Sequence, residues 1–201
     1  MAEEPEKLTA EVEEVEEVDE PELDREAAAR RAAAMTFIRR FGDPVLKSRA
    51  TPVDRFDDAL RSQVQRMAGL MQDALGVGLA APQLGISQRL LVYRIGHEAP
   101  LIALVNPELE WASDEEETLE EGCLSIPGIH VDVDRPLRVR VRARDELGEE
   151  RLVEASGLEA RVIQHEMDHL DGVLMIDRAP KEQRKEAMRT LREAERGERA
   201  A

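Results

Sequence analysis

The stretch QHEMDHLDG, residues 164–172, places two histidines four positions apart, with a glutamate directly after the first. On a helix that turns by about 100° per residue, His165, Glu166 and His169 project to one side. Leu158 and Val162 fall in the same sector. We therefore expect both histidines and the glutamate on the core-facing side of a helix, where a carboxylate is costly unless it is paired or near a cation.

The opposite side of this helix is polar. It carries Arg161, Gln164 and Asp168, which we expect to face away from the core, with Arg161 in a structural role. Ser156 and Glu159 have the spacing of a capping box, in which each side chain bonds to the backbone of the other residue. The helix is therefore predicted to begin at this pair and to run to about residue 171.

The pattern H-E-x-x-H indicates a metal site, because histidines at i and i+4 can bind one ion while the glutamate serves as general base. Chance matches to five residues occur, and the alternative is two core histidines beside a glutamate at a helix edge. Two histidines do not complete a metal site. Cys123, in EEGCLSIPG at residues 120–128, is the candidate third ligand, although a lone cysteine is usually a small buried hydrophobe.

A third stretch, GVGLAAPQLG at residues 76–85, contains two closely spaced glycines. It is not a phosphate-binding loop, because no Lys-Ser/Thr pair follows it. A helix end and a turn would explain it, yet it also carries Gln83, whose side chain can donate a hydrogen bond to an oxyanion.

The wider pattern predicts an α+β domain. A helix is expected over residues 54–75, from the spacing of its apolar side chains. Strands are expected at residues 89–95 and 101–111, and a hairpin begins with the alternating LRVRVRAR of residues 137–144. With a last, highly charged helix at residues 181–196, these elements favour antiparallel or mixed sheets around a central metal-binding helix, with one helix on the N-terminal side and one at the C-terminus.

Charge is unevenly distributed along the 201 residues. Residues 1–34 contain 13 acidic and 4 basic side chains, a net charge of −9 out of −16. We expect residues 1–34 to be a disordered or weakly helical acidic tail and residues 35–201 to form the folded domain. So acidic a chain is a poor general binder of nucleic acid.

The single cysteine excludes an internal disulfide, and this favours a reducing compartment, the cytoplasm. No apolar run approaches the roughly 20 residues that span a bilayer, so no membrane association is expected.

The motifs GVGLAAPQ, EGCLS and QHEMDHLDG occur in this order and at similar spacing in peptide deformylases, and the chain resembles that family over residues 35–178. The resemblance implies that Cys123, His165 and His169 bind one divalent metal ion, with a water or hydroxide in the fourth position. Ferrous iron is the expected metal, and zinc, nickel or cobalt can replace it.

The resemblance also implies the reaction, which removes the formyl group from the N-terminal formylmethionine of newly synthesised polypeptides and releases formate. Glu166 would act as general base and then as general acid. The Gln83 side chain and the Leu124 backbone N–H would stabilise the oxyanion.

Substrate binding is assigned by the same resemblance. Val77, Leu158 and Val162 match positions of the apolar pocket for the methionine side chain, with plain core packing as the alternative for each. Gly78 and Gly122 are expected to bind the peptide backbone, which could add along a strand edge.

The sequence leaves open what the C-terminal helix does, which class of enzyme this is and whether the protein is catalytic at all. The C-terminal helix could contact the ribosome, as in some bacterial relatives, or be a solvated helix with i,i+4 ion pairs. The alternative enzyme is a metallopeptidase built on H-E-x-x-H. The non-catalytic alternative is a metal-stabilised module that binds nascent chains or the ribosome.

Overall fold

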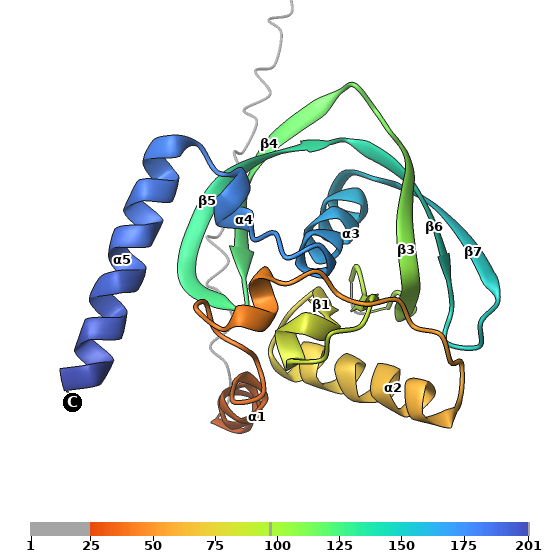
Figure 1. Cartoon of the computed structure of the whole chain (residues 1–201), viewed down its shortest axis with the longest axis horizontal. Coiled ribbons are helices and arrows are strands. Elements are labelled where there is room, and N and C mark those ends of the chain that lie inside the picture. The colour runs from red at the N-terminus through yellow and green to blue at the C-terminus, as the bar shows by residue number, and fades with distance from the viewer. Residues whose placement is uncertain (1–24, 97, 201) are drawn as a thin grey trace, which may run out of the picture.

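The computed structural model describes residues 25–96 and 98–200 (Figure 1). Its helices are α1 (Arg25–Met35), α2 (Asp58–Asp73), α3 (Gly157–Leu170), α4 (Met175–Arg178) and α5 (Lys181–Ala200), with 3-10 turns at Pro44–Lys47 and Ala81–Leu84. Its strands are β1 (Gly78–Ala80), β2 (Leu90–Tyr93), β3 (Ile102–Ala112), β4 (Glu116–Cys123), β5 (Ile126–Pro136), β6 (Arg138–Arg144) and β7 (Glu150–Ser156).

These strands form two antiparallel sheets. The larger has the order β1-β2-β3-β6-β7, and the smaller pairs β4 with β5. Figure 1 shows α3 between the two sheets, and it contacts strands of both. The predicted α+β class and the predicted hairpin, β6–β7, are therefore confirmed.

Helix α2 lies within the predicted range of residues 54–75. Asp57 caps its N-terminus, since the carboxylate accepts from the N–H groups of Ala59 and Leu60 at 3.1 and 3.2 Å. Its apolar face packs against the larger sheet. After the helix ends, Leu75 adopts the left-handed conformation, with φ of 59°.

Helix α3 begins where predicted, but the capping box does not form. The Ser156 side chain makes no cap hydrogen bond. Glu159 instead accepts a hydrogen bond from the Tyr93 hydroxyl on β2 at 2.9 Å. A contact between helix and sheet thus replaces the local contact that the sequence suggests.

Strands β1, β4 and β5 and the short helix α4 were not predicted. In β5, Val131 and Val133 are buried while the residues between and beside them are more exposed. Strand β4 is exposed at most positions and buries Glu121. This strand was not predicted because most of its residues are acidic and exposed.

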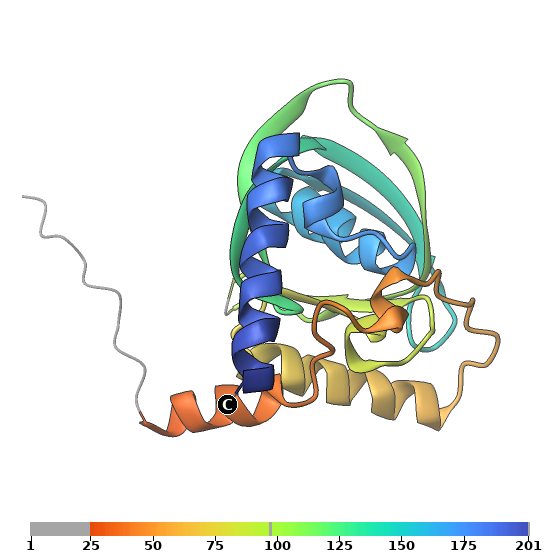
Figure 2. The same cartoon turned by 60° about the vertical axis from the view of Figure 1, so that its left-hand side comes forward.

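The helices near the two ends of the chain, α1 and α5, have bounds that differ from the predicted ones. Helix α1 covers residues 25–34 of the predicted tail and packs on α2, whereas residues 1–24 lie outside the described part of the chain. Helix α5 contacts β5 and stands in front of the smaller sheet in Figure 2. No described helix has the length and apolar character required to cross a membrane.

Candidate metal centre and active site

The three predicted ligands come together in the structure. Cys123 ends β4 at an irregularity in the β4–β5 pairing, and the two histidines lie one turn apart on α3. One ligand atom of each residue lies within 4.8 Å of those of the other two. Cys123 Sγ is 3.3 Å from His169 Nε2.

These separations suit a single metal ion. Bonds of about 2.3 Å to sulfur and about 2.0–2.1 Å to nitrogen at tetrahedral angles place the two donors ~3.5 Å apart, close to the observed distance. The rings of His165 and His169 meet edge to face, with centroids 5.1 Å apart. The donor set therefore fits a metal ion. Among the described residues, it is the one group of three or more His, Cys, Asp or Glu side chains that could hold such an ion.

Glu121 orients one of the imidazoles. Its Oε2 lies 2.9 Å from His165 Nδ1, so a proton on Nδ1 leaves Nε2 free to bind the metal. His169 Nδ1 is buried and has no hydrogen-bond partner in the described part of the chain.

The charge state of Cys123 also suits metal binding. Burial raises the pKa of this thiol, but the His169 and His165 rings beside it more than reverse that effect and hold the pKa well below its usual range. The thiolate is the form that binds metals. The same pairing, with Glu121 adding to it, opposes the effect of burial on His165 and raises the pKa of its imidazole.

Glu166 is buried beside the cluster, with 4% of its surface exposed. Its Oε2 has no hydrogen-bond partner among the described residues. Burial is the main reason why the pKa of this carboxyl is raised. A carboxyl in such an environment is suited to accept and return a proton near neutral pH.

Gln83 points its amide nitrogen at the same cluster. Its Oε1 accepts a hydrogen bond from the Ala80 N–H at 2.8 Å, and its Nε2 lies 3.7 Å from Cys123 Sγ and 3.3 Å from Ser125 Oγ. The bond to Ala80 fixes which end of the amide faces the cluster, so the donor is directed toward the site.

A cavity of about 240 Å³ opens beside these groups and lies between β1 and β4. All five predicted substrate-binding residues line it. The complete lining is Val77, Gly78, Gln83, Glu120, Glu121, Gly122, Cys123, Leu124, Leu158, Arg161, Val162, His165 and Glu166. The site thus combines three candidate metal ligands, a buried carboxyl, an amide donor and a partly apolar cavity.

Comparison with known proteins gives a consistent result. The sequence model of the family described as polypeptide deformylase matches residues 35–185. The chain belongs to this family. A peptide deformylase of Acidothermus cellulolyticus is 51% identical over 166 residues, which are 81% of this chain and 88% of that protein.

Solved structures agree with this assignment. A peptide deformylase from Synechococcus elongatus in complex with actinonin is 44% identical, with a TM-score of 0.73 over 76% of this chain and 85% of that one. The enzyme from Thermotoga maritima is 49% identical, with a TM-score of 0.69 over 71% of this chain and 96% of that one. The predicted deformylase family and hydrolase class are confirmed.

A buried charge network supports the metal centre of this family member. Glu121 accepts hydrogen bonds from Arg135 Nε and Nη2 at 2.8 and 2.9 Å, and from Arg161 Nη1 at 2.8 Å, in addition to its contact with His165. Arg135 and His165 outweigh the effect of burial and hold the pKa of Glu121 well below its usual range. An ionised carboxylate therefore lies behind His165, one of the candidate metal ligands.

The expectation that the polar side of α3 faces away from the core is wrong. Arg161 and Asp168 are buried, with 6% and 7% of their surfaces exposed. Asp168 accepts from Arg135 Nη1 at 2.6 Å and pairs with Arg178, and Arg161 also donates to the Val133 carbonyl at 2.9 Å. The second face of the helix thus packs on the smaller sheet through ion pairs, and Arg161 does have a structural role.

Glu121 and Arg161 are the site residues that the sequence analysis did not assign to the site. Glu121 lies two positions before Cys123, and alternate residues of a strand share a face. Had β4 been predicted, that spacing would have placed Glu121 on the side of the ligand cysteine. Arg161 offered no comparable local signal, since its partners lie on β4 and β5.

Gly78 allows Glu166 to sit where it does. A Cβ at this position would lie 2.5 Å from Glu166 Oε1 and 2.8 Å from its Cγ. We expect Gly78→Ala to bind metal normally but to have kcat reduced by about 10–100-fold, because a shift of about 1 Å in a catalytic group can cost ~10²-fold. Steady-state formate release and metal analysis measure both quantities.

Gly69 offers a matched control within α2. Nothing lies within 4 Å of a Cβ at this position. Gly69→Ala should keep the wild-type rate and raise the free energy of unfolding by about 0.5–1 kcal/mol, since alanine is favoured over glycine in a helix. Equal kcat values for the two alanine variants would contradict the role given to Gly78.

Proposed function

We propose that this enzyme removes the formyl group from the N-terminal formylmethionine of newly synthesised polypeptides and releases formate. The convergence of one thiol, two imidazoles and a buried carboxyl at a cavity between two sheet edges supports this most directly, since Oε2 of that carboxyl has no partner in the described part of the chain. We further propose that α3 is the metal-binding helix around which the two sheets pack.

In this proposal Cys123, His165 and His169 hold one divalent ion, which we propose to be Fe²⁺, with Zn²⁺, Ni²⁺ or Co²⁺ able to substitute. When bound, such an ion lowers the pKa of a water molecule and polarises a carbonyl group. A sulfur ligand also separates this site from H-E-x-x-H metallopeptidases, whose third ligand is typically a histidine or glutamate.

Glu166 moves the proton. It accepts one from water as the water oxygen adds to the formyl carbon. It then gives that proton to the amide nitrogen as the C–N bond breaks, so that formate and a free amino terminus result. The carboxyl suits both steps because burial raises its pKa and Oε2 has no competing partner within the described chain.

The oxyanion that forms on the carbonyl oxygen is stabilised by the Gln83 Nε2–H and by the Leu124 N–H. Support for Gln83 comes from its fixed amide, whose donor end faces Cys123. Leu124 follows Cys123 directly and lines the same cavity.

The methionine side chain occupies the apolar part of the cavity, at Val77, Leu158 and Val162. The peptide backbone adds along β1 and β4 at Gly78 and Gly122. Each of these two strands has a neighbour on one side only in its sheet, so each has a free edge that can pair with an extended chain.

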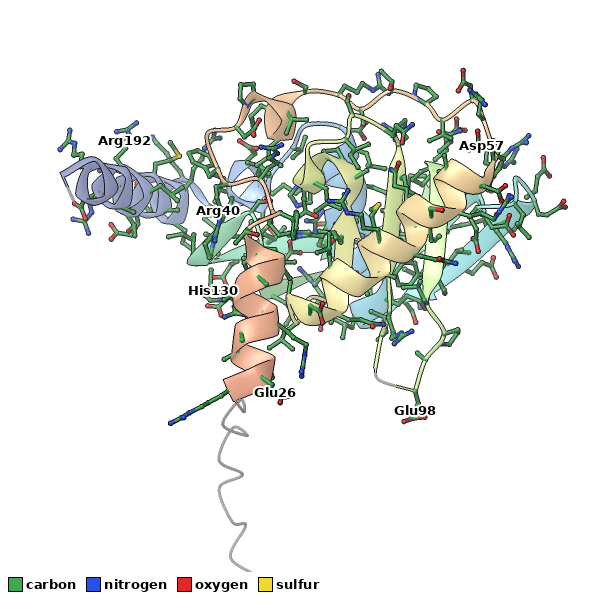
Figure 3. The ribbon with its side chains drawn as sticks, turned by 90° about the horizontal axis from the view of Figure 1, so that it is seen from below. Glu26, Arg40, Asp57, Glu98, His130 and Arg192 are labelled. Atoms are coloured by element: carbon green, nitrogen blue, oxygen red, sulfur yellow. The ribbon has the colours of Figure 1, made fainter. Side chains whose placement is uncertain are left out.

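The proposal places the enzyme in the cytoplasm, where formylated chains emerge from the ribosome, and includes ribosome contact by α5. Lys185 and Arg192 support this contact, since in the described part of the chain neither forms an ion pair, whereas Arg184 and Arg189 do. Arg192 extends from the part of α5 that stands apart from the sheets (Figure 3).

The assay compares formyl-Met-Ala-Ser with its acetylated and unformylated forms. We expect formate from the first peptide, little acetate from the second, because the extra methyl must fit at the metal, and no cleavage of the third. Cleavage of internal peptide bonds would indicate a metallopeptidase instead. Metal in the protein without formate release would indicate a binding module.

A further inference from the structure

A second cavity, of about 450 Å³, adjoins the one described above. The two share Val77, and the second continues past Gly76 and Leu75 to Arg94. Its walls include two exposed apolar side chains, since Val77 and Leu75 have 47% and 56% of their surfaces exposed. A groove therefore leads from the metal centre to an arginine.

Arg94 is fixed in place but lacks an acidic partner. Its backbone N–H donates to the Val77 carbonyl at 2.9 Å. When the Gln72 side-chain amide is oriented with its oxygen toward the guanidinium, that oxygen accepts hydrogen bonds from Arg94 Nη1 at 2.7 Å and Nη2 at 3.3 Å. Nε is buried and has no partner in the described part of the chain.

No carboxylate of the described residues pairs with this guanidinium. The acidic residue of the same loop, Glu98, points away from the body of the protein in Figure 3. Among the described residues, the one side chain that accepts a hydrogen bond from Arg94 is thus a neutral amide, that of Gln72. A positive charge consequently stays uncompensated at the wall of the groove, in a chain whose net charge is −16.

The direction of the substrate follows from the proposed function, on which this inference rests. The formyl group must lie near Glu166, whose carboxylate occupies the space that a Cβ on Gly78 would take. An extended chain advances about 3.3 Å per residue, so a peptide that runs back along Gly78, Val77 and Gly76 reaches the second cavity within two or three residues.

We propose that the second cavity binds the substrate residues that follow the methionine, and that Arg94 makes it selective for an acidic side chain there. A guanidinium offers several donors in a planar fork that matches a carboxylate. Exposed pairs of this kind are worth little individually, so the expected preference is modest, about 3–5-fold in kcat/KM.

The test compares kcat/KM for formyl-Met-Ala-Glu with that for formyl-Met-Ala-Lys, and repeats the comparison with the charged residue at the second and fourth positions. The wild type should favour glutamate by about 3–5-fold at the best position. This ratio should fall toward 1 at about 1 M salt, where the Debye length is only about 3 Å.

Variants assign the preference to one residue. Arg94→Gln should bring the ratio to about 1, Arg94→Glu should reverse it, and Arg94→Lys should retain part of it. Arg140→Gln is the matched control, because it removes the same charge from an exposed ion pair between Arg140 on β6 and Glu154 on β7. It should keep the wild-type ratio.

The outcomes separate the two proposals. Formate release from formyl-Met-Ala-Ser without any acidic preference overturns the role of Arg94 and leaves the deformylase activity standing. A preference that Arg94→Gln and Arg140→Gln reduce equally reflects net charge and overturns it as well. No formate from any peptide, with the metal bound, contradicts the proposed function itself.

Discussion

The Glu166→Gln variant is expected to bind metal as the wild type does and to release formate about 10²–10⁴-fold more slowly. Glutamine has nearly the same shape, so the contact with Gly78 is retained, but its amide cannot accept and return a proton. The measurements are kcat for formyl-Met-Ala-Ser and metal content per chain. A rate within a factor of about three of the wild type would exclude Glu166 as the proton carrier.

Cys123→Ala separates loss of chemistry from loss of metal. Removing the thiolate leaves two imidazoles, so this variant should lose both metal and activity, and added metal should not restore the rate. If Cys123→Ala instead retained tightly bound metal, the proposed ligand set would be wrong, whatever the rate of the Glu166→Gln variant.

Stability gives a second measurement on Glu166→Gln. A carboxyl whose pKa is raised on folding binds more protons in the folded state, so it reduces stability as pH rises above its unfolded pKa of about 4.3. The metal-free wild type should therefore lose stability relative to Glu166→Gln as the pH rises above about 4.3. Unfolding in urea at several pH values measures this difference.

The parts of the site that could be predicted from sequence have local signals. One helical turn relates His165, Glu166 and His169, so their spacing alone places them on one face. Cys123 carries no such signal. It lies 46 positions from His169, and its assignment as ligand depended on the order of three motifs shared with peptide deformylases.

The buried charges could not be predicted because their partners are remote. Arg161 and Asp168 look solvent-facing on a helical wheel, yet they pair with Glu121 and Arg135, which lie 40 and 33 positions away. A wheel describes only one helix. It cannot show that a second sheet covers the polar side and neutralises it.

Strand β4 was concealed for a related reason. Its residues EETLEEGC are mostly acidic and exposed, so the alternation of apolar and polar side chains that marks a half-buried strand is missing. The buried position in this strand is a glutamate, paired with arginines from β5 and α3. Ion pairs thus take the place of the apolar contacts by which strands are usually recognised.

Arg135 bridges the two carboxylates of this network, and Arg135→Met is expected to lower the free energy of unfolding by about 1.5–3 kcal/mol, because Glu121 and Asp168 each lose a buried donor but keep Arg161 and Arg178. Its side chain is 3% exposed and bonds to both Glu121 and Asp168. Arg140→Met breaks an exposed pair and should cost only about 0–1 kcal/mol. Urea unfolding of the metal-free proteins at pH 7 compares the two.

The double variant Arg135→Met/Glu121→Gln keeps the prediction testable if the single variant fails to fold. Because each substitution breaks the same Arg135–Glu121 pair, the loss in the double variant should be clearly smaller than the sum of the two single losses, so that the two substitutions are strongly non-additive. Additive losses would show that Arg135 acts through packing and not through its charge.

Lowering the pH should reveal the same interaction between Arg135 and Glu121. The pKa of Glu121 is depressed in the fold, so its pairing stabilises the protein above the unfolded pKa of about 4.3 and is lost as pH falls below that value toward the folded pKa. Without Arg135, the pKa of Glu121 in the folded protein is depressed less. Protonation of Glu121 in acid therefore removes less of the free energy of unfolding. The difference in unfolding free energy between wild type and Arg135→Met should therefore narrow below about pH 4, whereas a packing defect would persist unchanged into acid.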